Sequence, residues 1–298
     1  MSKIILLILL INTFLFAGNS THNENKASKA YNEKNFKIAH KLYSQLSKED
    51  NAFAQFELAG MYHDGIGTQK NIKKAISLYE KSAKNGNTLA KVELGILYVS
   101  GKNIKQDYKK AFKYFKDASK TGNDEANYYL GRMYWNGYGV NKDYTKAVKY
   151  YKVAVKQGHA SAQYSLGSML KIGQGSTKDL KQAYSLFEKS ANNIPWSAYS
   201  LAIAYLEGNT FIKKDESKGM LYLSQAVEMK DLVATSYLAK IYHYGLYHQK
   251  KDSLKAMQYY EIAVTKYEHI HYNNSDAWQE SLARIKRLNK NIMYASLK

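Results

Sequence analysis

The feature that most constrains this chain is a sequence pattern that returns about every 36 residues. The segment LGILYVSGKNIKQDYKKAFKYFKDASKTG begins at Leu94, and LGRMYWNGYGVNKDYTKAVKYYKVAVKQG begins at Leu130. Both carry Leu-Gly, a Tyr four residues after the Leu, a Gly seven after it and an Asp thirteen after it. A catalytic motif normally occurs once, whereas a pattern that recurs at a fixed period indicates a repeat architecture.

Each copy begins with the pattern of a helix. The leucine column consists of Leu58, Leu94, Leu130, Leu166, Leu201 and Leu238, and an Ala or Gly follows each leucine. A small residue lies four positions before each leucine, and a Tyr lies four positions after it in five of the six copies. Side chains spaced by four share one helical face, and small ones let a neighbouring helix approach closely.

A second helix follows in every copy. A Gly lies seven residues after each leucine, where it can end the first helix in the left-handed conformation. The next column holds good helix N-caps, namely Asn71, Asp107, Asp143, Asp179, Asp215 and Asp252. Each copy is therefore predicted to be a helical hairpin that buries its apolar face by stacking on its neighbours, which makes the fold an all-α solenoid.

The column pattern Ala-x3-Leu-Gly-x2-Tyr-x2-Gly-x-Gly-Val-x2-Asp-x3-Ala is best matched from Ala126 to Ala147. It resembles the Sel1-like repeat, a relative of the tetratricopeptide repeat, over roughly residues 27 to 290. The resemblance implies a right-handed α-solenoid of stacked helix-turn-helix repeats with a scaffolding or adaptor role. The fifth copy departs at Gly219 and Leu223, and GLYHQKKD in the sixth lacks the second Gly, so these copies are expected to pack differently.

The two ends of the chain read differently from the repeats. Residues 1–18, MSKIILLILLINTFLFAG, have Lys3 before an apolar run and predict a secretory signal peptide, with an uncleaved anchor as the alternative. Residues 19–50 are predicted to form a degenerate first repeat, with a helix from Phe36 to Leu46. Six repeats then occupy residues 51–272, and a capping helix occupies residues 273–298. We expect a bacterial periplasmic or secreted protein without a transmembrane span after signal cleavage.

Composition excludes several kinds of chemistry. The chain has no Cys, which excludes disulfides, Cys-ligated metals and thiol catalysis. Its net charge is +19, and only three of its 44 basic residues are Arg. Because sequence-specific nucleic-acid readers favour Arg, this charge fits a polyanionic envelope surface or solubility better. The lysines between Lys105 and Lys156 are expected to form a solvated outer face rather than a dedicated polyanion site.

In tetratricopeptide-like stacks the first helix of each hairpin lines the concave side, so the resemblance implies a binding face there. The helical phase gives as candidates Phe56, Tyr128, Arg132, Trp135, Tyr164, Lys171, Trp196 and Tyr199. Val92 and Leu206 share this phase. Aromatic and Arg side chains are typical of interface cores. The alternative is that curvature buries much of this stripe against adjacent helices.

Motifs for catalysis are weak. Ser168 and Lys171 match Ser-x-x-Lys, but no Lys-Thr-Gly or Ser-Asp-Asn accompanies them. The histidines near the C-terminus lack a His-Glu-x-x-His arrangement. We therefore expect no catalytic residue, no metal site and no cofactor.

Three function classes follow from these observations. The first is an exported, non-enzymatic scaffold that binds a protein or peptide on the concave face. The second is an immunity or inhibitor protein that blocks a toxic envelope-acting enzyme. The third is an enzyme acting on cell-wall or β-lactam substrates, with Ser168 as its nucleophile.

Overall fold

The computed structural model describes residues 22–269, with side chains up to Val264. Every regular element in this part of the chain is a helix, so the all-α prediction is confirmed. The elements are a helix over residues 22–32, α2 (Phe36–Lys48), α3 (Ala52–Asp64), α4 (Ile72–Lys84), α5 (Thr88–Ser100), α6 (Tyr108–Ser119), α7 (Asp124–Asn136), α8 (Tyr144–Lys156), α9 (Ala160–Ile172), α10 (Leu180–Ser190), α11 (Pro195–Glu207), α12 (Glu216–Glu228), α13 (Leu232–Tyr244) and α14 (Ser253–His269).

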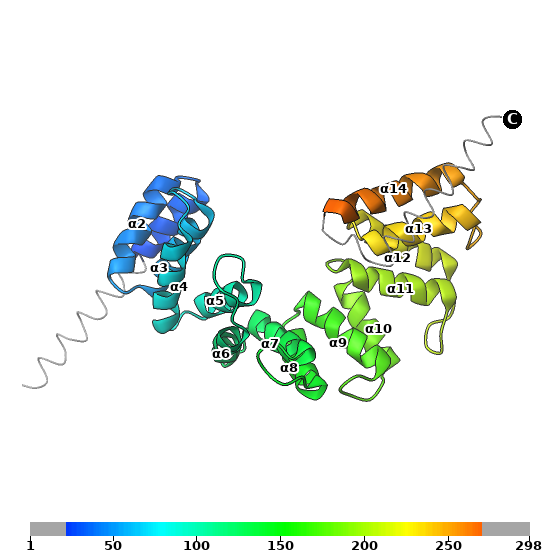
Figure 1. Cartoon of the computed structure of the whole chain (residues 1–298), viewed down its shortest axis with the longest axis horizontal. Helices are drawn as coiled ribbons and strands as arrows, with labels where there is room; N and C mark the ends of the chain where they lie inside the picture. Colours follow the sequence, from blue (N-terminus) through cyan, green and yellow to red (C-terminus); the bar gives the residue numbers. More distant parts are fainter. Residues whose placement is uncertain (1–21, 270–298) are drawn as a thin grey trace, which may run out of the picture. The chain divides into compact units, whose positions relative to one another are not determined.

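Successive helices pack as hairpins, as Figure 1 shows. Helix α3 packs on α4, α5 on α6, α9 on α10, α11 on α12 and α13 on α14. Neighbouring hairpins meet through pairs such as α4 with α5 and α12 with α13. The protein is thus an all-α repeat solenoid. It divides inside α8 into a first unit that ends at Ala154 and a second unit that begins at Val155.

The leucine column is the core of the hairpins. All six leucines are buried, which stabilises the fold by roughly 1.5–3 kcal/mol for each such side chain. The small residues beside them allow close approach. A Cβ on Gly131 would lie 2.5 Å from Cε1 of Tyr151, and one on Gly95 would lie 2.5 Å from Cε1 of Phe115. Aromatic rings of the second helix therefore lie directly against the backbone of the first helix.

The predicted N-caps are confirmed. In all six repeats the Asn or Asp side chain accepts a hydrogen bond from the backbone N–H three residues later, at 2.9–3.0 Å. A second cap column starts the first helices, and the sequence analysis missed it. Asn51, Asn87, Asn123 and Asp231 accept from the N–H groups of Ala54, Ala90, Ala126 and Ala234, and His159 accepts from that of Ala162.

The predicted glycine ends hold in five repeats. Gly65, Gly101, Gly137, Gly173 and Gly245 are left-handed. Gly208 differs, with φ 72° and ψ 164°. The next residue organises this turn, because Oδ1 of Asn209 accepts from the N–H groups of Phe211 and Ile212, each at 2.9 Å. The fifth repeat therefore departs from the others, as its sequence indicated.

The helix expected over residues 36–46 is confirmed as α2, which continues to Lys48. The predicted signal peptide (1–18) and C-terminal capping helix (273–298) lie outside the described residues. Within the part of the chain that the structure describes, no helix combines the length and apolar character that crossing a membrane requires.

Candidate partner-binding surface

In the first unit, Tyr128, Arg132 and Trp135 lie on one side of α7 because they are spaced by four and three residues. The guanidinium carbon of Arg132 lies 5.7 Å from the centroid of the Tyr128 ring and 5.6 Å from that of Tyr129. The Tyr128 ring also packs against Tyr151, with 6.0 Å between centroids. Trp135 keeps 43% of its surface exposed. Arg132 and Tyr128 therefore form a cation–aromatic pair that packs against Tyr151, and the exposed indole of Trp135 lies on the same side of α7.

In the second unit, aromatic rings connect the first helices of neighbouring hairpins. Tyr164 on α9 lies 5.7 Å from Trp196 on α11, measured between ring centroids. One turn further along α11, Tyr199 meets Tyr237 on α13 edge-on at 6.0 Å. Trp196 is 54% exposed, whereas Tyr164 and Tyr199 are half-buried. Ring contacts thus link α9 to α11 and α11 to α13, and Trp196 is the most exposed of these four rings.

A hydrogen bond to Asp231 also fixes the orientation of the Trp196 indole. Its N–H donates to the carboxylate of Asp231, the N-cap of α13, whose Oδ1 accepts from Ala234 N at 2.7 Å. Asp231 is buried, and this burial raises the pKa of its carboxyl group, although the hydrogen bonds oppose the shift. The exposed ring is thus oriented by a buried polar contact.

Phe56 and Lys171 are less available than the two tryptophans. Phe56 is half-buried on α3, with its centroid 5.7 Å from that of Tyr79. Lys171 is half-buried in the last turn of α9. Two further positions of the stripe are fully in the core, since Val92 is 4% and Leu206 0% exposed. Packing against adjacent helices therefore buries part of the stripe, as the alternative interpretation held.

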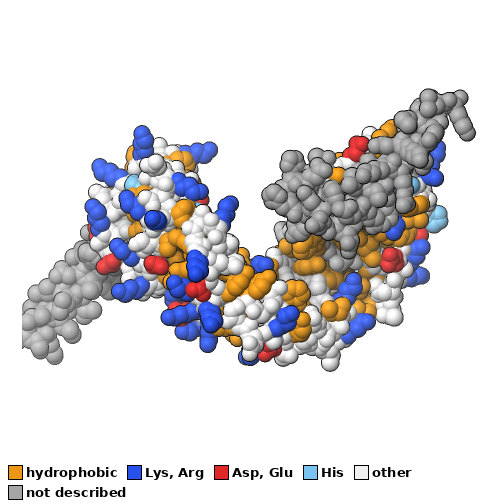
Figure 2. All heavy atoms as spheres, viewed as in Figure 1, with side chains coloured by type: hydrophobic (Ala, Val, Ile, Leu, Met, Phe, Trp, Pro, Cys, Tyr) orange, Lys and Arg blue, Asp and Glu red, His pale blue; other side chains and the backbone are white. Residues whose placement is uncertain are grey.

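Carboxylates lie along the first helices of the first unit. Burial raises the pKa of Glu57 on α3 and of Glu93 on α5. Glu125 and Asp64 add to the rise in the pKa of Glu93, and His63 opposes it. Helices α3, α5 and α7 together hold five carboxylates against Lys91 and Arg132, in a chain whose net charge is +19. In Figure 2, apolar and lysine side chains share much of the visible surface of this unit.

The family profile described as Sel1 repeat matches residues 52–87, 88–123, 124–159, 160–193, 197–231 and 233–266, which together exceed half of the chain. The chain belongs to the Sel1 repeat family. This confirms the resemblance drawn from the Ala126–Ala147 columns. No curated protein sequence matches the chain.

The chain is also similar to solved structures. A Sel1 repeat protein from Oxalobacter formigenes is similar at a TM-score of 0.75 and 25% identity, over 81% of this chain and 99% of the other. A protective antigen present in uropathogenic Escherichia coli strains, which displays an SLR fold, is similar at a TM-score of 0.53 and 20% identity, over 93% of this chain and 71% of the other. An immunity protein from Pseudomonas aeruginosa has a TM-score of 0.45 and 21% identity, over 68% of this chain and 81% of the other.

The structure places the possible catalytic pair of this Sel1 repeat protein on an ordinary helix. Ser168 and Lys171 are both half-buried and lie about one turn apart on α9. Among the described residues, no group of three His, Cys, Asp or Glu side chains is arranged to hold a metal ion. His248 instead contacts Glu216, with 2.6 Å between Nδ1 and Oε2.

A Lys–Tyr–Tyr stack, which was not predicted from the sequence, joins the two helices of a Sel1 repeat. In the third repeat, Tyr134 of α7 and Tyr150 of α8 are stacked at 5.6 Å, and Lys146 Nζ lies 5.4 Å from the Tyr134 centroid. The same stack forms in the second, fifth and sixth repeats. The fourth repeat has Leu170, Gln182 and Leu186 at the three positions. The sequence signal for the stack is that all three residues are replaced together in the fourth repeat.

Proposed function

We propose that this Sel1 repeat protein is a non-enzymatic scaffold or adaptor that binds a protein or peptide on the first helices of its repeats. The observation that carries the proposal is the exposure of Trp135 and Trp196, each beside half-buried aromatic side chains. Indoles in such settings often dominate binding energy, because they bury a large area at little cost in side-chain entropy. In the first unit, Tyr128 and Arg132 would contribute beside Trp135, with Phe56 on α3. In the second unit, Tyr164 and Tyr199 would contribute beside Trp196, with Lys171 on α9.

The charges favour a partner segment that is both apolar and basic. Burial raises the pKa of Glu93, and the nearby carboxylates of Glu125 and Asp64 add to the rise, so a Lys or Arg of the partner would stabilise the charged form of Glu93. Apolar side chains of the same segment would pack on Trp135. An amphipathic basic helix or an extended basic peptide combines both properties.

The proposed location is the bacterial periplasm or the medium, with signal cleavage after Ala17 or Gly18. Mass spectrometry of the exported protein should give an N-terminus at Gly18 or Asn19. A mature protein that retained Met1 would contradict the cleaved signal and favour the anchor.

Crosslinking and mass spectrometry of the native envelope fraction would identify the partner, and titration with the purified partner would then test the face. Trp135→Ala and Trp196→Ala are each expected to weaken binding by roughly 30-fold, as expected for about 2 kcal/mol at a central aromatic residue. The matched controls are Ile38→Ala and Leu221→Ala, since these side chains are 55% and 67% exposed on the second helices α2 and α12. Equal losses in controls and test variants would contradict the proposal.

Two experiments separate the other two functions, namely identification of the crosslinked partner and labelling with penicillin. A toxic envelope-acting enzyme as the crosslinked partner, inhibited on binding, would make the protein an immunity factor. An enzyme of cell-wall or β-lactam chemistry would be acylated at Ser168 by labelled penicillin, and Ser168→Ala would abolish the label. We expect no acylation of the wild-type protein.

A further inference from the structure

A cavity of about 590 Å³ lies among α4, α5 and α6, entirely within the first unit. Its polar lining is dominated by lysines, which are Lys84, Lys91, Lys110, Lys113, Lys116 and Lys120. Only two carboxylates line it, those of Glu80 and Asp117, so its formal charge is +4 from six lysines and two acids. Five of the six lysines are exposed, as the sequence predicted for a solvated lysine face, and the structure adds that they line one hollow.

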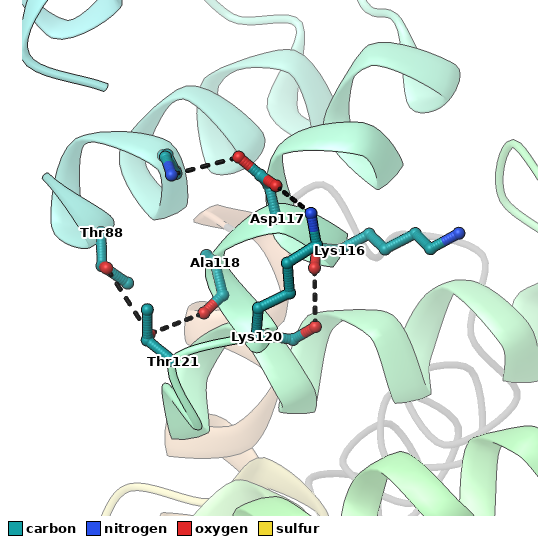
Figure 3. Close-up of polar contacts among 8 residues, drawn as sticks. Thr88, Lys116, Asp117, Ala118, Lys120 and Thr121 are labelled. Carbon is teal, nitrogen blue, oxygen red and sulfur yellow. Dashed lines mark hydrogen bonds and ion pairs between the residues drawn. The ribbon is translucent and has the colours of Figure 1, made fainter. Parts of the chain in front are cut away.

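The carboxylate of Asp117 forms ion pairs with two of these lysines. Asp117 accepts from Lys120 at 2.6 Å and pairs with Lys91 at 3.1 Å, and these hydrogen bonds lower the pKa of Asp117. Figure 3 shows the Lys116 side chain extending away from Asp117. The ion pairs found among the described residues include neither Lys84 nor Lys113 nor Lys116. Most of the positive charge of the cavity is therefore not neutralised by the protein.

Two tyrosines form an aromatic wall. Tyr98 and Tyr114 are stacked, with 5.9 Å between centroids and 10° between ring planes, and Lys110 Nζ lies 5.1 Å from the Tyr98 centroid. The Tyr114 hydroxyl group is protonated at neutral pH, as is usual for Tyr, and can donate a hydrogen bond; burial raises its pKa further. Because aromatic rings have a low dielectric constant, this wall also strengthens the electrostatic field of the lysines inside the cavity.

We propose that this cavity binds a ligand that carries two or more closely spaced phosphate groups. A multiply charged anion matches the excess of +4, and the cavity volume lies in the range of small-molecule sites. Lysines bind phosphate groups as point charges, and every basic residue of the lining is a Lys. Lys91 and Tyr98 of the lining lie on the first helix α5, but no lining residue is among the residues proposed for the partner face, so the two sites can be tested separately.

Calorimetric titration of the full chain with inorganic tripolyphosphate at low ionic strength tests this site. The triple variant Lys84→Gln, Lys113→Gln, Lys116→Gln is expected to bind roughly tenfold more weakly. Its matched control is Lys178→Gln, Lys181→Gln, Lys189→Gln, which removes the same charge from exposed positions in the second unit that do not line the cavity. The control should bind within about twofold of the wild type, because its three lysines do not line the cavity and are exposed to solvent. Circular dichroism would establish that both variants are folded.

Three results would overturn the proposal: no binding of tripolyphosphate by the wild type, equal losses in the two triple variants, or equally tight binding of citrate. Co-sedimentation with phosphatidylcholine vesicles, with and without cardiolipin, identifies the source of the phosphates. Binding to cardiolipin vesicles that depends on the cavity lysines and is displaced by tripolyphosphate would assign a lipid headgroup. Tripolyphosphate binding without vesicle binding would assign a soluble phosphorylated ligand.

Discussion

Gly219 on α12 makes room for Leu206 on α11. A Cβ added at Gly219 would lie 2.6 Å from Cγ of Leu206 and 2.9 Å from its backbone N. Leu206 is 0% exposed as a result. The other repeats have Ala at the position of Gly219, and the side chains at the position of Leu206 are not buried in them. In the fifth repeat the first helix therefore buries a leucine where the second helix lacks a methyl group.

Gly219→Ala is therefore expected to destabilise the protein by about 1–3 kcal/mol, the usual cost of overpacking a core. This steric cost exceeds the roughly 1 kcal/mol that Ala gains over Gly in a helix. The free energy of unfolding in urea is the measurement. Gly60→Ala on α3 is the control, because the nearest atom to its added Cβ would be the Tyr79 hydroxyl oxygen at 3.8 Å, and this variant should be stabilised. Adding Leu206→Val to Gly219→Ala should recover part of the loss, and full additivity would contradict the contact.

The sequence was sufficient to predict most of the hairpin because each signal acts locally. An Asp at a helix start needs only its own next turn to accept a hydrogen bond, and Asp107 and Asp179 do so as expected. The burial of Leu206 is different, since it depends on a missing methyl group on another helix. The departure at Gly219 was visible in the sequence, but its compensating partner was not.

The candidate face was predictable to a similar degree. Helical phase placed Trp135 and Trp196 on the first helices, and both are exposed. The same phase also selected Val92, which is buried, because phase fixes the direction of a side chain but not the distance to the next hairpin. The lysine cavity could not be predicted, since it requires α4, α5 and α6 to be placed together.

The Lys–Tyr–Tyr stack should contribute to stability in the fifth repeat. Lys218 Nζ lies 4.3 Å from the Tyr205 centroid and donates to the Tyr205 hydroxyl oxygen at 2.6 Å. Lys218→Met keeps the aliphatic length but removes the cation, and we expect a loss of about 0.5–1 kcal/mol in unfolding free energy. Gln182→Lys introduces a cation beside Leu170 and Leu186, and it should give no gain. A double-mutant cycle of Lys218→Met with Tyr205→Leu that showed no coupling would contradict the interaction.

Asp231 should make stability depend on pH. Burial raises the pKa of its carboxyl group above that of the unfolded chain, so the folded state binds the proton more tightly. The free energy of unfolding should therefore fall as the pH rises from about 4 through the folded pKa. Asp231→Asn should flatten this dependence in urea unfolding between acidic and neutral pH, leaving the part due to Glu57 and Glu93, whose pKa values burial also raises.

Asp215→Asn is the matched control for that experiment. Asp215 caps α12 through the same kind of hydrogen bond, from Lys218 N at 2.9 Å, but it is exposed. Its variant should keep the fall in unfolding free energy with rising pH that the buried carboxyl groups cause. A profile for Asp231→Asn that is indistinguishable from the wild type would show that the buried carboxyl group does not carry the effect.

Gly139 should be the least replaceable glycine of the third repeat. Its φ is 69°, and an added Cβ would lie 2.7 Å from both the carbonyl carbon and the carbonyl oxygen of Tyr108, at the start of α6. Gly139→Ala therefore meets left-handed strain and a clash with backbone atoms that cannot rotate away, and we expect a loss above about 3 kcal/mol. Gly86→Ala separates the two effects, because Gly86 has φ 96° but no atom within 4 Å of the added Cβ. That variant should lose only about 1–2 kcal/mol. Equal losses in the two variants would mean that the loop of the third repeat does not press on the preceding hairpin, and that backbone strain alone fixes this glycine.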